Sequence, residues 1–199
     1  NAYLEHKNAA SAFIGWLQNG ATATIDMCFA GENVTLNSWE TGAFIGQGNG
    51  ADFRFHISNS FSRASMTSSH RYGLHGDFYG NGLKESSVSN CFNANGPIYS
   101  ASTSATIANC YATAGSVGTV ITAANMQGED ALTSANKMPA LGNKFLATQG
   151  YPEINFEGKV VIPTPDYVWD GTTAAPSEGD GSEETPYIIK TAEEFVHVM

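Results

Sequence analysis

Apolar and polar positions recur along much of the chain in one short motif. The motif has an aliphatic residue, two intervening residues, a Cys or Ser, and then an aromatic residue. It occurs four times, at residues 25–29 (IDMCF), 57–61 (ISNSF), 88–92 (VSNCF) and 107–111 (IANCY). Equivalent positions are 32, 31 and 19 residues apart. Repetition at such intervals is typical of proteins that are built from stacked units.

A second apolar segment precedes each of the first three motifs and ends in glycine. These segments lie at residues 12–15 (AFIG), 42–46 (GAFIG) and 72–76 (YGLHG). In each of these three repeats, an Asn-Gly pair lies between the apolar segment and the motif, at residues 19–20, 49–50 and 81–82. Such a pair favours a tight turn. Each repeat therefore predicts two strands joined by a turn. In the shorter fourth repeat, Pro97-Ile98-Tyr99 is predicted to replace the first strand.

The spacing inside the motif predicts a bend. Side chains of a strand alternate between faces, so two residues three positions apart face the same side only if the chain bends between them. Asn tolerates the left-handed conformation that such a bend needs. It occupies the bend in three motifs, as Asn59, Asn90 and Asn109, and Met27 takes its place in the first. A bend at the same place in successive repeats predicts an all-β fold, a parallel β-helix.

Stacked repeats would place equivalent residues in rows about 4.8 Å apart. The predicted rows are aliphatic (Ile25, Ile57, Val88, Ile107), small (Cys28, Ser60, Cys91, Cys110), amide (Asn59, Asn90, Asn109) and aromatic (Phe29, Phe61, Phe92, Tyr111). The last set, called the aromatic row below, is a candidate sugar-stacking surface if it faces outward. Regular stacking for stability accounts for it equally well.

The three cysteines occupy equivalent positions, one in each of three repeats. This spread does not match a disulfide framework or a zinc site, whose ligands must converge on one point. Parallel Cα–Cβ vectors would hold the Cβ atoms of Cys91 and Cys110 too far apart for a disulfide. We therefore predict free, structural thiols.

The repeats resemble those of GLUG-type repeat proteins of bacterial cell surfaces. The resemblance rests on the glycine-flanked triplet at residues 43–46 and on the motif at residues 107–111, which is followed by Gly115 and Val117. It covers roughly residues 12–158. It implies a right-handed parallel β-helix in a large secreted or wall-anchored protein, a class often linked with adhesion, and it supplies no catalytic motif. His75 and Met27 depart from the pattern.

The remaining chain predicts covering elements and a linker. Met138, Leu141 and Phe145 have helical spacing, so a short helix is predicted within residues 129–146. With a strand at residues 151–156, it would form a C-terminal cap, because the end of a β-helix exposes unpaired backbone. These elements complete a domain over residues 1–158. Residues 159–183, rich in Pro, Gly and acids, predict a linker.

Residues 184–199 resemble the opening strand and cap helix of a new array of the same family. Thr191 and Glu194 form a capping box, so a helix is predicted to begin at Ala192. We expect this segment to dock on the first repeat near Phe13, in its own chain or in a neighbouring one. The docking residues are predicted to be Tyr187, Ile188, Ile189 and Phe195.

Charge and length exclude several classes of partner. The net charge of the 199-residue chain is −10, and no basic cluster is present to neutralise phosphates, so nucleic acid is an improbable ligand. No apolar run approaches the roughly 20 residues of a membrane-spanning helix, so no membrane insertion is expected.

The chain begins NAYLEHKNAA, without an initiator Met. We therefore expect it to be part of a longer protein.

Candidate catalytic and metal-binding residues are scattered. An enzyme on a β-helix would use clustered acids and bases, and the candidates are Asp52, Arg54, Arg71, His75 and Asp77. A metal site could draw on His70, His75 and Asp77, or a calcium site on Asp180, Glu183 and Glu184. Neither set has the spacing of a known ligand motif. We predict no catalytic residues, no cofactor and no metal.

Together these features predict a non-catalytic, extracellular bacterial surface module. It would act as a rigid stalk or adhesin, secreted or at the cell surface, and its partners would be further copies of itself or a cell-surface glycan or protein. Self-association would be head to tail, through the C-terminal segment. The alternative is a carbohydrate-active β-helix, either a glycan-binding module or a polysaccharide lyase.

Overall fold

The structure is a computed structural model that describes residues 2–49, 52–76, 78–79, 85–99, 105–156, 172–182, 184–185, 187–188 and 194. The chain forms two compact units, Asn1–Glu157 and Gly158–Met199, which are treated separately below. The described part of the first unit is mostly β-structure with parallel sheets, as the repeats predict.

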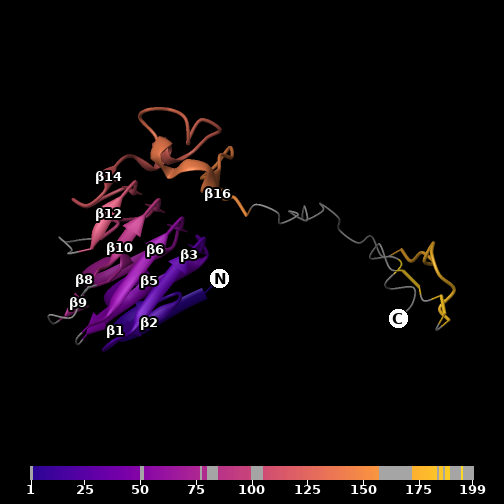
Figure 1. Ribbon diagram of the computed structural model, residues 1–199, viewed down its shortest axis with the longest axis horizontal. Helices are drawn as coiled ribbons and strands as arrows, with labels where there is room; N and C mark the ends of the chain where they lie inside the picture. The colour runs from indigo at the N-terminus through magenta and orange to yellow at the C-terminus, as the bar shows by residue number, and fades with distance from the viewer. Residues whose placement is uncertain are drawn as a thin grey trace. The chain divides into compact units, whose positions relative to one another are not determined.

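Three parallel sheets form most of the first unit (Figure 1). The first contains β1 (Ala2–Ser11), β2 (Ile14–Leu17), β5 (Val34–Asn49), β8 (Ser65–His75) and β9 (Phe78–Tyr79). The second contains β3 (Thr22–Asp26), β6 (Arg54–Ser58), β10 (Ser87–Ser89) and β12 (Thr106–Ala108). The third contains β4 (Phe29–Ala30), β7 (Phe61–Ser62), β11 (Phe92–Asn93), β13 (Tyr111–Ala112) and β14 (Thr119–Val120). Strands from successive repeats pair in parallel within each sheet.

The predicted bend lies between the second and third sheets and is confirmed. Asn59, Asn90 and Asn109 have φ of 48°, 51° and 53°, in the left-handed region. Their side chains form the predicted ladder, in which the Asn109 amide donates to Asn90 Oδ1 over 3.0 Å and the Asn90 amide donates to Asn59 Oδ1 over 3.2 Å. The Asn59 amide donates to Asp26 Oδ1 over 2.7 Å. Asp26 thus continues the ladder where the first repeat lacks Asn.

Met27 adopts the same bend without the residue that favours it. Its φ is 52°, and a left-handed conformation costs a non-glycine residue about 1–2 kcal/mol, less for Asn. We expect Met27→Asn to raise the free energy of unfolding by about 0.5 kcal/mol, because lost packing by the Met side chain offsets part of the relieved strain. The reciprocal change Asn90→Met is the control, and urea unfolding should show it to be destabilising. Equal destabilisation by both variants would contradict this explanation of the bend.

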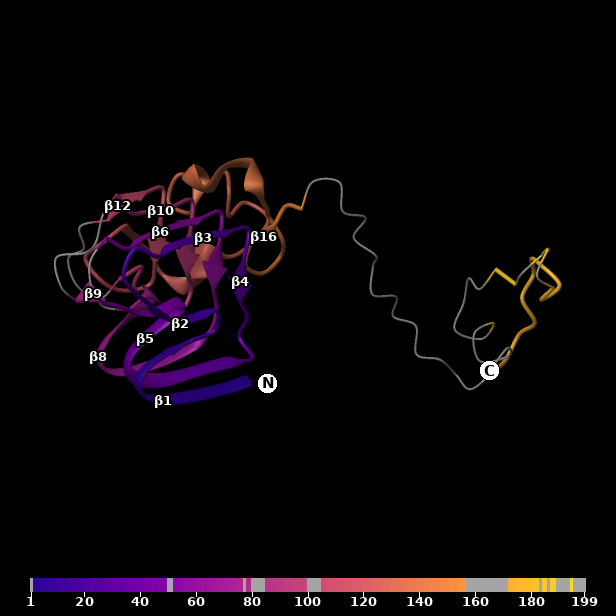
Figure 2. The same ribbon diagram turned by 60° about the horizontal axis from the view of Figure 1, so that its bottom comes forward.

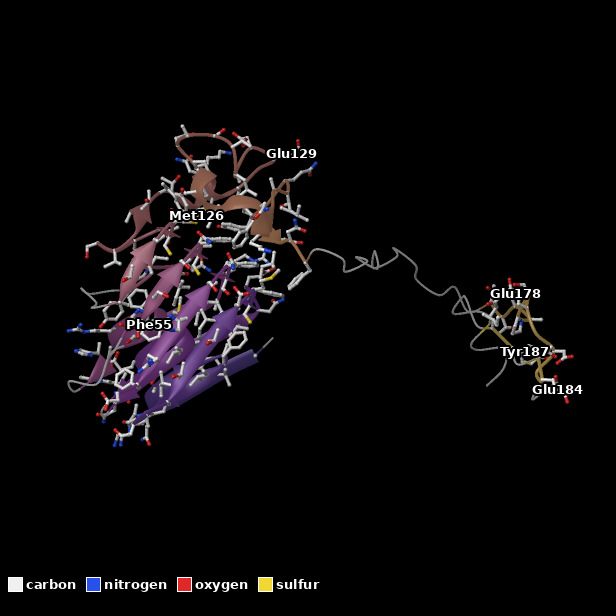
Figure 3. All side chains as sticks on the ribbon, in the orientation of Figure 1. Phe55, Met126, Glu129, Glu178, Glu184 and Tyr187 are labelled. Carbon is white, nitrogen blue, oxygen red and sulfur yellow. The ribbon has the colours of Figure 1, made fainter. Side chains whose placement is uncertain are left out.

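The main core contains buried side chains from all three sheets, including Phe55 (Figure 3). The predicted aliphatic row is confirmed, because Ile57 pairs with Ile25 on one side and Val88 on the other, and Val88 pairs with Ile107. Such regular pairing brings like side chains into contact and fills the interior without gaps.

The glycines that end the second and third apolar segments, Gly46 and Gly76, are required by close approach between strands. A Cβ atom on Gly76 would lie 1.8 Å from the carbonyl oxygen of Gly46, and one on Gly46 would lie 2.7 Å from that of Gly15. Each glycine therefore lets its strand pack against the backbone of the preceding repeat. The fourth repeat differs, since Tyr99 forms an isolated antiparallel bridge with Gly73 in place of a parallel strand.

The predicted helix within residues 129–146 is wrong. Residues 129–136 form turns, and two short 3₁₀ helices flank them, η1 (Ala123–Met126) and η2 (Pro139–Lys144). Pro139 lacks the N–H that a continuing helix needs, and Gly142 interrupts η2 with a φ of 73°. The segment ends in an antiparallel pair, β15 (Phe145–Leu146) and β16 (Glu153–Ile154). In the described residues, no helix is both long and apolar enough to cross a membrane.

Candidate functional site

The aromatic row runs along the third sheet, outside the main core. The Phe29 and Phe61 rings stack with centroids 5.3 Å apart, and the Phe61 and Phe92 rings stack at 4.8 Å with planes 3° apart. Phe92 and Tyr111 are direct partners in the sheet. These residues follow the bend in each repeat, and the bend turns them away from the main core into a second apolar cluster.

Buried side chains from residues 123–154, the segment drawn in orange in Figure 2, pack against most of the aromatic row. The Phe145 ring lies 5.8 Å from Phe92 and 6.5 Å from Phe61, and the Tyr151 ring stacks on Phe92 at 6.3 Å. The Tyr111 hydroxyl accepts a hydrogen bond from the backbone N–H of Ala140. Phe61, Phe92 and Tyr111 are consequently buried, whereas Phe29 is 50% exposed. Only Phe29 presents an accessible ring.

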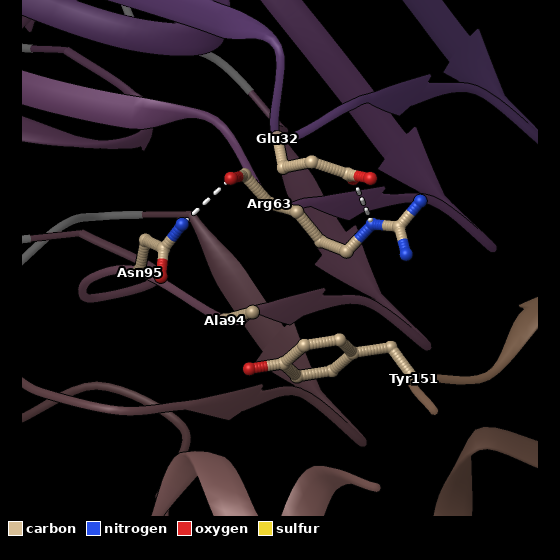
Figure 4. A pocket seen from close by; sticks show the side chains of 5 residues that line it. All are labelled: Glu32, Arg63, Ala94, Asn95 and Tyr151. Carbon is tan, nitrogen blue, oxygen red and sulfur yellow. Dashed lines mark hydrogen bonds and ion pairs between the residues drawn. The ribbon is translucent and has the colours of Figure 1, made fainter. Parts of the chain in front are cut away.

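A shallow cleft of about 310 Å³ lies beside the covered row (Figure 4). Its lining residues are Glu32, Arg63, Ala94, Asn95 and Tyr151. Arg63 pairs through Nε with Glu32 at 3.0 Å, its guanidinium lies over the Phe61 ring at 5.4 Å, and its carbonyl accepts from the Asn95 amide. Planar polar groups beside an aromatic ring offer hydrogen bonds and stacking to a small polar ligand.

The sequence patterns do not predict this cleft. Glu32 and Asn95 follow the aromatic residues of their repeats by three positions, but Arg63 follows Phe61 by two, so these lining residues do not recur at one place in the repeat. Tyr151 comes from the covering segment, whose path the repeats do not predict.

The three thiols are free, as predicted. Burial raises the pKa of the Cys91 thiol well above its usual range, and a hydrogen bond with Cys110 raises it further. Burial also raises the pKa of Cys28. The thiols of Cys28 and Cys91 are therefore neutral and poorly nucleophilic at neutral pH, which fits a packing role. The hydrogen bond with Cys91 lowers the pKa of Cys110.

Two of the candidate catalytic residues, Arg71 and His75, share a neighbour in Tyr99. His75 is buried between the Tyr99 and Phe55 rings, with Nδ1 2.8 Å from the carbonyl oxygen of Gly76. Arg71 donates to the Tyr99 hydroxyl, whereas Asp52 and Arg54 are exposed. Asp77 lies outside the described residues. Across the residues that the structure describes, no three His, Cys, Asp or Glu side chains gather as metal ligands.

The C-terminal unit contains a local hydrogen-bonded turn around Asp180. Asp180 Oδ1 accepts from the Ser182 N–H at 2.9 Å and from the Thr185 hydroxyl at 2.6 Å. These bonds lower the pKa of Asp180 to about 2. The Asp180 carboxylate is therefore satisfied within its own turn. Glu183 lies outside the described residues and Glu184 is exposed.

Of the predicted docking residues, Tyr187 and Ile188 are exposed within this unit. The Ile188 N–H donates to the carbonyl of Glu178, which holds the segment against the turn. Ile189 and Phe195 lie outside the described residues, as do Thr191 and Ala192 of the predicted capping box. Glu194 is helical and buried, and its carboxylate accepts from the Ser177 N–H.

Comparisons with protein-family models, with curated proteins and with solved structures found no match to this chain.

Proposed function

We propose that the three parallel sheets are the faces of a right-handed parallel β-helix. The strand order supports this, because the chain visits the first, second and third sheets in turn within each of the first two repeats and then returns to pair in parallel with the preceding repeat. The left-handed bends at equivalent positions also support it, since they turn the chain from the second sheet to the third. A resemblance to GLUG-type repeats implies the same winding.

We further propose a non-catalytic module of the bacterial cell surface or secreted space, which acts as a rigid stalk or adhesin. The observation that carries this proposal is the unbroken stacking of the aliphatic, amide and aromatic rows through successive repeats. Side chains stacked in register resist bending and slippage between repeats. Burial of the aromatic row beneath residues 123–154 supports a structural role for that row.

A glycan-binding module is the second candidate. The observation that favours it is the cleft between Arg63 and Tyr151, next to the half-exposed Phe29 ring. A polysaccharide lyase would need acids and bases that act on one sugar. Arg71 and His75 both contact Tyr99, but the His75 side chain is buried, whereas Asp52 is exposed.

Self-association through the C-terminal segment is the part of the proposal most open to test. Among the described strands, β1 and β2 of the first repeat pair with β5 alone, and Phe13 and Trp16 there have exposed aromatic rings. An edge strand of this kind can accept a further strand or an apolar segment. We expect light scattering to show concentration-dependent assemblies for the full chain and a monomer for a chain ending at Pro163.

Two surface variants provide a matched comparison. Ile188 and Leu146 are 51% and 49% exposed, and Leu146 lies outside the predicted docking segment. We expect Ile188→Ser to weaken assembly and Leu146→Ser to leave it unchanged. If the full and shortened chains have the same mass at every concentration, the self-association proposal is wrong.

A further inference from the structure

The outward side of the first sheet presents two exposed rings on either side of a polar pair. Side chains of β5 alternate between the core and solvent up to Trp39, so Asn37 and Trp39 share the outward side. Tyr3 and Glu5 take the same side of β1, since Glu5 is the direct partner of Asn37. We call Tyr3, Glu5, Asn37 and Trp39 the outer face.

The rings of the outer face are accessible and separated. Tyr3 is 61% exposed and Trp39 is 48% exposed. Tyr3 pairs with Thr35, and Trp39 follows Thr35 by four residues, so the backbone positions of Tyr3 and Trp39 are about 13 Å apart along the strand direction. Two sugar rings of one extended chain fit such a spacing.

Hydrogen bonds hold the polar groups between the rings. Glu5 Oε2 accepts from the Tyr3 hydroxyl at 3.2 Å, and Glu5 Oε1 accepts from the Asn37 amide at 3.3 Å. A carboxylate and an amide fixed in this way leave acceptor positions for ligand hydroxyl groups. Exposed Ser65 and Thr67 on the neighbouring strand β8 add further hydroxyls.

The Trp39 ring is held in place from behind. It stacks on the His70 ring with centroids 5.0 Å apart and planes 12° apart, and His70 in turn pairs with Glu40, whose side chain is fully buried. Opposite Trp39 of β5, the strands β1 and β8 each contain one extra residue, Lys7 or Asn8 in β1 and Ser69 or His70 in β8. Aligned bulges re-aim side chains, and here they bring Trp39 and His70 together at the surface. A ring fixed before binding loses little entropy when a ligand stacks on it.

We propose that the outer face binds an extended, neutral polysaccharide chain, with sugar rings stacked on Trp39 and Tyr3 and hydroxyl groups bonded to Glu5 and Asn37. The flat C–H faces of pyranose rings match exposed aromatic rings, and their hydroxyls match the polar pair. This site lies on a different sheet from the cleft at Arg63. It requires neither the self-association proposed above nor the cleft.

Charge and polarity favour a neutral polysaccharide over an acidic polysaccharide, a nucleic acid or a protein as the ligand of the outer face. Glu5 and Lys7 balance each other on β1, and the chain as a whole carries −10, which disfavours acidic polysaccharides and nucleic acid. A protein partner usually needs a continuous apolar centre. In the outer face, a charged and an amide side chain separate the two rings.

The test titrates the full chain with cellohexaose, xylohexaose and mannohexaose, and with hexagalacturonate as the acidic comparison. The ¹⁵N-labelled protein reports on binding through the indole N–H signal of Trp39, which is assigned by its loss in Trp39→Phe. We expect at least one neutral hexasaccharide to shift this signal. Isothermal titration should show Trp39→Ala weakening its binding roughly tenfold or more, as expected for one stacked ring.

Phe156→Ala is the matched control, because Phe156 is an aromatic residue that is 39% exposed and follows β16, outside the first sheet. It should bind like the unaltered chain. Tyr3→Ala, in an exposed position at the sheet edge, should weaken binding without unfolding, and it serves if Trp39→Ala fails to fold. The proposal is overturned if no neutral hexasaccharide shifts the Trp39 signal, if hexagalacturonate binds more tightly, or if Phe156→Ala loses as much affinity as the outer-face variants. A protein ligand that competes for Trp39 while all neutral glycans fail would identify the face as a protein interface.

Discussion

Gly76→Ala is expected to lower the free energy of unfolding by about 3 kcal/mol or more, and the melting temperature by about 6–12 °C. The added methyl group would lie 1.8 Å from the carbonyl oxygen of Gly46, which is backbone and cannot turn away. Relief requires β8 to move from β5, and that movement breaks parallel hydrogen bonds. Thermal unfolding followed by circular dichroism measures the effect.

Gly15→Ala is the control for this prediction. Gly15 holds the equivalent position in the first repeat, but a Cβ atom there would have no atom within 4 Å. Replacing glycine where the backbone allows alanine tends to stabilise a protein by about 0.4–1 kcal/mol, through the unfolded state. Comparable destabilisation by both variants would show that glycine is not required by the approach of the preceding repeat.

Phe92→Ala is expected to destabilise the protein by about 3–5 kcal/mol, the range found for large-to-small changes of buried aromatic residues. The Phe92 ring is fully buried, stacks on Phe61, and contacts Phe145 and Tyr151 of the covering segment. Its removal would leave a cavity between the third sheet and this segment. Urea unfolding should show a lower midpoint, and hydrogen exchange should show lost protection in residues 139–154.

Phe29→Ala tests whether the loss of stability depends on how deeply the ring is buried or only on its place in the aromatic row. Phe29 occupies the same position in the first repeat and stacks on Phe61, but half of it is exposed. We expect Phe29→Ala to lower the free energy of unfolding by about 1 kcal/mol, since only part of the apolar area of Phe29 is removed from water. If Phe29→Ala and Phe92→Ala have equal effects, the covering segment contributes little to stability.

Features that depend on the repeat could be predicted from the sequence. The odd spacing between Ile57 and Ser60 requires a bend, and Asn59 is the residue that tolerates it. The same logic predicts the rows, because equivalent residues of stacked repeats must meet. Met27 has a φ of 52° and so adopts the same bend, although Met does not favour this conformation. The place in the repeat therefore decides the backbone conformation here, and the residue type does not.

Features that depend on long-range packing could not be predicted in this way. The helical spacing of Met138, Leu141 and Phe145 correctly marks one buried side, but Pro139 and Gly142 prevent a continuous helix. Neither the cover over the aromatic row nor the stacking of Trp39 on His70 follows from a local pattern. Both depend on where separate segments meet, and the aligned bulges of β1 and β8 leave no periodic signal in the sequence.

The in-register parallel stack is tested most directly by methyl–methyl nuclear Overhauser effects in protein labelled at Ile and Val methyl groups. The structure predicts that Ile57 contacts Ile25 and Val88, and that Val88 also contacts Ile107, in the order of the repeats. These contacts join residues 19 to 32 positions apart in the sequence. If Ile57 instead contacts neither Ile25 nor Val88, the repeats are not stacked in register and the proposed β-helix is wrong.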